Sequence, residues 1–166
     1  MITIISGTNR PGSNTEKVAV QYLQLLKDRG VEAKFVSLVG LDVNERNAAI
    51  KKLEKEILIP ADKFIFISPE YNGSIPGVLK SLIDHSDIKN VWWGKKALLT
   101  GVSTGRAGNL RGMEHLTGIL HYVKMHVHPN KLPISVVDKL LNGANLITDT
   151  STLEAINEQL DEFLAY

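Results

Sequence analysis

The hydrophobic and polar residues of the chain follow two different periods, which alternate from one end to the other. Short apolar runs are typical of buried strands, and longer segments with apolar residues every three or four positions are typical of amphipathic helices. The short runs predict strands at residues 2–6, 32–38, 64–68, 97–101 and 124–128. The longer segments predict helices at residues 15–29, 47–58, 76–87, 110–123 and 152–164.

Strand–helix units repeated in this order predict an α/β fold, in which a doubly wound parallel sheet carries helices on both faces. Residues 64–68 read Phe-Ile-Phe-Ile-Ser, and a run without polar alternation is typical of a strand buried on both sides. The chain has 166 residues, of which 43% are hydrophobic, so we expect a single domain over residues 1–166 with a sizeable core. Ligands of such sheets bind beyond the carboxyl ends of the strands.

The loop after the first strand has the composition of an anion site. This first loop, residues 7–15, reads Gly-Thr-Asn-Arg-Pro-Gly-Ser-Asn-Thr and leads into the first helix. The first turn of a helix carries N–H groups without intrahelical partners and the positive end of the helix dipole, which together attract an anion. Arg10 adds a planar fork of donors that suits phosphate, and hydroxyl groups surround it. We therefore expect a phosphate here.

The type of phosphate site is narrowed by what the first loop lacks. Its glycines have the spacing of a P-loop, but Ser13 and Asn14 stand where a P-loop needs Lys and Ser or Thr. The dinucleotide fingerprint fails as well, because Asn9 replaces its second glycine. A single terminal phosphate, as on FMN, fits the hydroxyl-rich turn better. Ser13 or Asn14 could instead simply cap the helix.

A second loop follows the third strand. Residues 69–77 read Pro-Glu-Tyr-Asn-Gly-Ser-Ile-Pro-Gly, so two prolines fix the backbone near both ends and Gly73 permits a tight turn. Its tyrosine, asparagine and serine offer an aromatic face and amide groups, which are suited to a flat heteroaromatic ring. The alternative is a purely structural Asn-Gly turn that leads into a helix begun by proline.

A third loop follows the fourth strand. Residues 101–109 read Gly-Val-Ser-Thr-Gly-Arg-Ala-Gly-Asn, and the glycines would let the main chain approach a planar ligand. The same residues match Gly-x-Ser-x-Gly, the nucleophile turn of serine hydrolases, with Ser103 as nucleophile. That alternative needs Glu114 and one of three histidines, His121, His126 or His128, as triad partners, and the chain has no His-Gly-Gly segment for an oxyanion hole.

Charge and composition exclude several functions. A net charge of +1 argues against nucleic-acid binding and against an electron carrier of the usual strongly acidic kind. The chain has no cysteine, so disulfides, thiol catalysis and cysteine metal sites are excluded. No leader and no apolar run of about 18 residues is present, so we expect a cytoplasmic protein without a membrane partner. His126 and His128 lack an evident third ligand, and we predict no metal site.

The first two loops, with the second extended to Lys80, resemble the NADPH-dependent FMN reductase family. The family has a flavodoxin-like fold and includes flavin, quinone, azo-dye and chromate reductases, and the resemblance covers essentially the whole chain. It implies a five-stranded parallel sheet of order 2-1-3-4-5, FMN as cofactor, and NADPH or NADH as electron donor. It also implies a homodimer or homotetramer, with residues 78–85 at the dimer contact.

The resemblance also assigns roles to residues. By the family pattern, the FMN phosphate would be held by Thr8, Arg10, Ser13, Asn14 and Thr15. One side of the isoalloxazine ring would be flanked by Pro69, Glu70, Tyr71, Asn72 and Gly73. Its other side would be lined by Ser103, Thr104, Gly105, Arg106 and Gly108.

These roles predict an oxidoreductase with ping-pong kinetics. NAD(P)H would reduce the flavin, which then reduces a flavin, quinone or similar small acceptor. No side chain need serve as an obligatory acid or base, because the cofactor carries the chemistry. We expect Tyr71 and Asn72 to shape the reacting face. The alternatives are a flavodoxin-like electron carrier or FMN-binding protein without NAD(P)H activity, and a serine hydrolase that uses Ser103.

Overall fold

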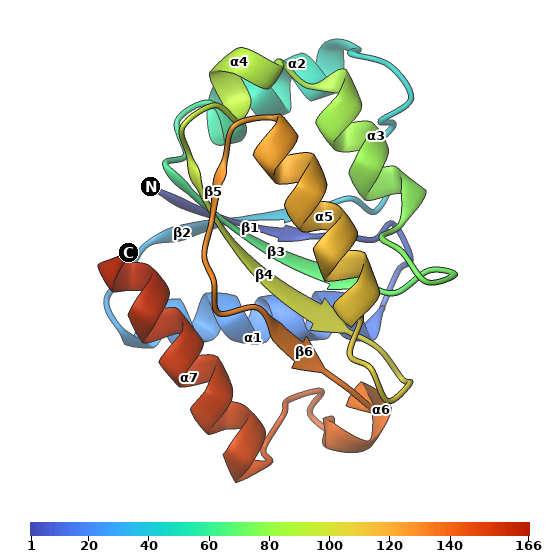
Figure 1. Ribbon diagram of the computed structural model, residues 1–166, viewed down its shortest axis with the longest axis vertical. Helices are drawn as coiled ribbons and strands as arrows, with labels where there is room; N and C mark the ends of the chain where they lie inside the picture. The colour runs from blue at the N-terminus through green and yellow to red at the C-terminus, as the bar shows by residue number, and fades with distance from the viewer.

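Six strands form one parallel sheet in the computed structural model, which describes residues 1–166 (Figure 1). The strands are β1 (Ile2–Ser6), β2 (Ala33–Ser37), β3 (Lys63–Pro69), β4 (Lys96–Val102), β5 (His126–Val127) and β6 (Leu132–Ile134). Their order is β2-β1-β3-β4-β5, and β6 pairs with β4. The predicted order 2-1-3-4-5, which is that of flavodoxin-like folds, is confirmed.

The register of the three central strands aligns their carboxyl ends. Ser6 of β1 lies opposite Ile67 of β3, and Pro69 of β3 lies opposite Val102 of β4. All five residues of β1 are buried, as expected for a strand covered on both faces. Because the strands are parallel and in register, the loops that follow β1, β3 and β4 leave the sheet at the same edge.

The fifth position of the sheet differs from the sequence prediction. A single strand was expected over residues 124–128, but Lys124 has a left-handed φ of 59° and β5 pairs with β4 only at His126 and Val127. Pro129 then interrupts the strand, because it has no amide hydrogen and a fixed φ. Residues Leu132–Ile134 return to β4 as β6, beside its carboxyl end. The position beside the third loop is therefore filled by a strand that the sequence pattern did not predict.

Helices cover both faces of the sheet (Figure 1). They are α1 (Asn14–Asp28), α2 (Ala48–Leu53) with a π-helical continuation (Glu54–Leu58), α3 (Gly77–His85), α4 (Ile88–Val91), α5 (Leu110–Tyr122), α6 (Val137–Leu140) and α7 (Thr150–Ala165). All five predicted helices are present, and the short α4 and α6 were not predicted. Helices α1 and α7 lie on one face, and α2 to α5 lie on the other. None of the helices is both long and apolar enough to span a bilayer.

The two faces of the sheet bury separate apolar clusters. On the α1 and α7 side, Tyr22 and Phe163 are fully buried among the inward residues of β1, β3 and β4. On the other side, the Trp92 ring packs 5.1 Å from Phe64 and 6.1 Å from Phe66, measured between ring centroids. Trp92 is fully buried and therefore serves the packing of this core. These cores form the rigid base from which the three loops project.

Candidate functional site

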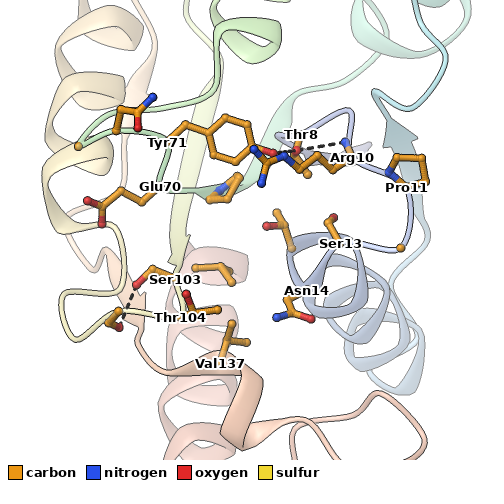
Figure 2. Close-up of a pocket in the computed structure, with 17 residues that line it drawn as sticks. Thr8, Arg10, Pro11, Ser13, Asn14, Glu70, Tyr71, Ser103, Thr104 and Val137 are labelled. Carbon is orange, nitrogen blue, oxygen red and sulfur yellow. Dashed lines mark hydrogen bonds between the residues drawn. The ribbon is translucent and has the colours of Figure 1, made fainter.

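A cavity of about 610 Å³ opens at the edge of the sheet where the three loops leave it (Figure 2). This volume lies within the range of small-molecule sites. The first loop and the start of α1 form one wall, the second loop forms another, and the third loop with Val137 of α6 closes it (Figure 2). Three segments that are far apart in the sequence therefore meet around one space.

The cavity is lined by all but two of the residues predicted for the site. The lining residues among them are Thr8, Arg10, Ser13, Asn14, Thr15, Pro69, Glu70, Tyr71, Asn72, Gly73, Ser103, Thr104 and Gly105. The two outside the cavity are Arg106 and Gly108. Val137, which also lines it, was missed because it lies after β6, in a segment without a recognisable motif.

The start of α1 supplies free hydrogen-bond donors to the cavity. Ser13 is the N-cap, and its Oγ accepts a hydrogen bond from the Glu16 amide at 3.1 Å. The amides of Asn14 and Thr15 have no partner within the protein. Capping by Ser13 is thus confirmed, and it leaves the two preceding amides of the turn available. Since these N–H groups lie at the positive end of the helix dipole, they suit an anion.

The start of α7 differs from that of α1, because a carboxylate of the chain itself caps this helix. Asp149 accepts hydrogen bonds from the Thr152 amide at 2.9 Å and from the hydroxyl groups of Ser151 and Thr152. These bonds lower the pKa of the Asp149 carboxyl, because they stabilise its charged form. At α1 the cap is a neutral serine, and the acidic side chain of the first turn, Glu16, accepts a hydrogen bond from Ser37 Oγ at 2.8 Å. The comparison identifies α1 as the end that is suited to an external anion.

Arg10, Thr8 and Tyr71 join the first loop to the second. The Arg10 guanidinium lies over the Tyr71 ring, 4.3 Å from its centroid, and the Tyr71 hydroxyl is 2.6 Å from Thr8 Oγ1 (Figure 2). The Arg10 amide donates to the same Thr8 oxygen at 3.3 Å. No carboxylate pairs with Arg10. Its in-plane N–H donors therefore remain available at the cavity.

The second loop contains a tight hairpin turn. Tyr71 and Ser74 exchange two backbone hydrogen bonds, and Asn72 and Gly73 between them have φ values of 53° and 77°. Two successive left-handed residues are what an Asn-Gly pair favours. The turn is also bonded to α5, because Ser74 Oγ forms a hydrogen bond of 2.9 Å with Nδ1 of His115. The structural reading of an Asn-Gly turn is correct, and the same turn presents Asn72 to the cavity.

The third loop is held by main-chain contacts with β6 and α6. The Ser103 amide donates to Ile134 O at 3.0 Å, and the Val137 amide donates to Ser103 O at 3.1 Å. The Val136 amide donates to Gly105 O at 3.0 Å. The side chain of Ser103 is engaged within the loop, because its Oγ donates to Gly105 O at 3.0 Å. The position of this loop at the cavity is therefore set by its contacts with β6 and α6.

Arg106 and Gly108, which the family pattern also assigns to the flavin, do not line the cavity. Arg106 is exposed outside it. A Cβ atom on Gly108 would stand 2.6 Å from Cβ of Pro133, and one on Gly101 would stand 2.1 Å from the carbonyl oxygen of Gly108. Gly101 and Gly108 are thus required where the loop packs on itself and on β6. Their small size serves folding of the loop.

Asn109 ties the third loop to the end of β3. Its φ is 64°, and its side chain is fully buried and donates from Nδ2 to the carbonyl oxygens of Ser68 and Pro69, both at 2.9 Å. Asparagine is one of the few residues other than glycine that adopt this conformation readily. The residue therefore fixes the second and third loops to each other below the cavity.

The structure does not assemble a hydrolase triad. Ser103 Oγ is bonded to its own loop, and no hydrogen bond joins it to a histidine. Glu114, the expected acid, pairs with Lys131. The His128 ring packs edge-on against Tyr166, with ring centroids 4.9 Å apart. A serine nucleophile needs a base within hydrogen-bond reach and an orienting group behind it, and these residues are dispersed.

The chain is similar to known proteins over nearly its whole length. A model of the NADPH-dependent FMN reductase family matches residues 1–137. Over 168 residues the chain is 29% identical to an NAD(P)H-dependent FMN reductase of Pseudomonas aeruginosa, a match that covers 94% of this chain and 89% of that protein. Over 174 residues it is 29% identical to a 2-hydroxy-1,4-benzoquinone reductase of a Burkholderia species, covering 99% and 94%.

A solved structure shares the fold. FerB, a flavoenzyme NAD(P)H:(acceptor) oxidoreductase from Paracoccus denitrificans, superposes with a TM-score of 0.80 at 23% identity. The match covers 99% of this chain and 95% of that one. The fold similarity therefore includes the edge of the sheet where the cavity lies.

Proposed function

The chain belongs to the NADPH-dependent FMN reductase family, and on that premise we propose that it is an FMN-dependent oxidoreductase. FMN would bind in the cavity between the three loops. NADPH or NADH would be the electron donor, and a flavin, quinone or similar small molecule would be the acceptor. The observation that carries the proposal is at the start of α1, where two free amides and Arg10, which has no carboxylate partner, line the same cavity.

The chemistry of the cavity fits FMN. One end offers the free amides of Asn14 and Thr15 and the guanidinium of Arg10, which match a phosphate dianion. The other end offers the side-chain amide of Asn72 and the main chain of the third loop at Thr104 and Gly105, which match the polar edge of a flat ring. A ligand with a charged tail and a heteroaromatic head therefore has partners at both ends.

The residues of the chain would bind and orient, while FMN would supply the redox chemistry that side chains lack. Arg10 and the start of α1 would fix the phosphate, and the rigid turn around Asn72 would fix the edge of the ring. Because the cavity is open, the nicotinamide and the acceptor would use the exposed face in turn, which is ping-pong order. No side chain need act as an obligatory acid or base, since solvent can protonate the reduced acceptor.

We also propose a cytoplasmic homodimer or homotetramer. A groove of about 840 Å³ between α3 and α5, lined in part by Ile83, Ile119 and Tyr122, supports assembly on this face. Tyr122 is 85% exposed in the single chain and adds an aromatic side chain to this face. Residues 78–85, expected at the dimer contact, contribute to the groove through Lys80, Ile83 and Asp84.

The test is anaerobic reduction of the protein loaded with FMN. We expect loss of the yellow flavin absorbance on addition of NADPH or NADH, and its return when a quinone is added. Bound flavin that neither nicotinamide reduces would favour an electron carrier. A protein that does not retain FMN at micromolar concentrations would overturn the proposal.

A further inference from the structure

The Tyr71 side chain is engaged by the phosphate end of the cavity. Although Tyr71 belongs to the second loop, its hydroxyl is bonded to Thr8 Oγ1 at 2.6 Å and one of its ring faces carries the Arg10 guanidinium (Figure 2). Thr8 is only 1% exposed, so the hydroxyl is anchored on a fixed group. The ring is thus held between a buried hydroxyl and a cation of the first loop.

These contacts reduce the entropic cost that Arg10 would otherwise face on binding a ligand. Arg10 is an exposed side chain on a loop, and a long flexible side chain loses rotamer freedom when it grips a ligand. Stacking on an aromatic face fixes the plane of a guanidinium and leaves its in-plane N–H donors free. An arginine held in this way is already oriented when an anion arrives.

We propose that Tyr71 is a positioning residue for the phosphate, which acts by orienting Arg10. The proposal rests on the function proposed above and deepens it, because it moves Tyr71 from the reacting face of the ring to the grip on the charged tail. The same contact connects the two loops, because the turn that presents Asn72 is linked through Tyr71 to the anion site of the first loop.

The two roles of Tyr71 are separated by comparing FMN with riboflavin, which has the same ring and no phosphate. In the Tyr71→Leu variant we expect the dissociation constant of FMN to rise about tenfold, because the cation–π contact and the hydroxyl bond are both lost. The dissociation constant of riboflavin should change by less than about twofold, within the scatter expected where no contact is lost. Flavin fluorescence titration measures both constants.

Two further variants sharpen the result. Tyr71→Phe keeps the aromatic face beneath Arg10 and loses only the bond to Thr8, so we expect a smaller loss of FMN affinity, about threefold. Trp93→Leu is the matched control, because it also removes a cation–π contact but lies outside the cavity. The Lys124 ammonium group lies 3.8 Å from the centroid of the Trp93 ring. This control should leave the preference for FMN over riboflavin unchanged. In the Arg10→Ala background, Tyr71→Leu should have no further effect on that preference.

The outcome that overturns the inference is an equal loss of affinity for FMN and riboflavin in both Tyr71 variants, since Tyr71 would then contact the ring. Unchanged affinity for both ligands would overturn it as well. Retained riboflavin binding shows that a variant is folded. Failure of the unsubstituted protein to bind FMN would instead defeat the proposed function, so the two failures are distinguishable.

Discussion

The first and second loops meet the cavity in one way, and the third loop meets it in another. The first two are joined by side chains, through Thr8, Arg10 and Tyr71. The third is linked to β6 and α6 by its main chain, through hydrogen bonds from residues 103, 136 and 137, and a side chain holds it only at its end, through Asn109. One wall of the cavity therefore depends on side-chain chemistry, whereas the opposite wall depends on how closely backbone segments approach.

This difference separates the residues of a motif that are available to a ligand from those that the fold itself requires. In the first loop, Arg10 has no carboxylate partner and the amides of Asn14 and Thr15 are free, so these groups are left for something outside the chain. In the third loop, Gly101 and Gly108 are required by contacts within the protein. Similar glycine-rich segments at one edge of a sheet thus serve different ends.

The substitution with the largest expected effect on the difference between the loops is Gly101→Ala. The added Cβ would stand 2.1 Å from the carbonyl oxygen of Gly108, which is backbone and cannot rotate away. We expect a loss of about 3 kcal/mol in the free energy of unfolding, at the upper end for overpacking. For a chain of this size that lowers the melting temperature by about 6–12 °C. Thermal unfolding followed by circular dichroism measures it.

Gly105→Ala is the matched control within the same loop. A Cβ on Gly105 would have only Ser103 Oγ nearby, at 3.8 Å, which is ordinary contact. Its unfolding free energy should change by less than about 0.5 kcal/mol, as for a substitution without a clash. If both variants were equally stable, the third loop would not depend on close backbone approach, and the comparison would fail.

The sequence predicts this architecture well where pattern and local chemistry decide. The alternating periods predicted the parallel α/β architecture and every long helix, and Ser13 caps α1 as a serine there should. The order of the strands came from the family resemblance. It could not predict β6, because a three-residue strand after Pro129 has no periodicity of its own. Because β6 sets the path of the third loop, the position of Arg106 and Gly108 outside the cavity and the omission of Val137 have this one cause.

The second test sets one arginine against another. Arg10→Ala should raise the dissociation constant of FMN at least about tenfold, because a charge-assisted hydrogen bond to phosphate is worth about 1.5–3 kcal/mol. Riboflavin affinity should stay nearly constant. Arg106→Ala removes the same side chain from outside the cavity and should leave both affinities within about twofold, as expected for a surface substitution. Equal losses in the two variants would show that net charge, not position, attracts the flavin.

The smallest expected effects compare two hydroxyl groups that face the cavity. Thr8→Val keeps the shape of the side chain and removes the oxygen that bonds Tyr71, so FMN affinity should fall about threefold, the worth of one neutral hydrogen bond. Ser103→Ala removes an oxygen whose bond stays within its own loop, and FMN affinity should fall by about twofold at most, since the main-chain bonds to β6 persist. Fluorescence titration with FMN distinguishes the two. A larger loss from Ser103→Ala than from Thr8→Val would mean that the third loop grips the flavin by its side chain. The division between a wall made of side chains and a wall made of backbone would then have to be abandoned.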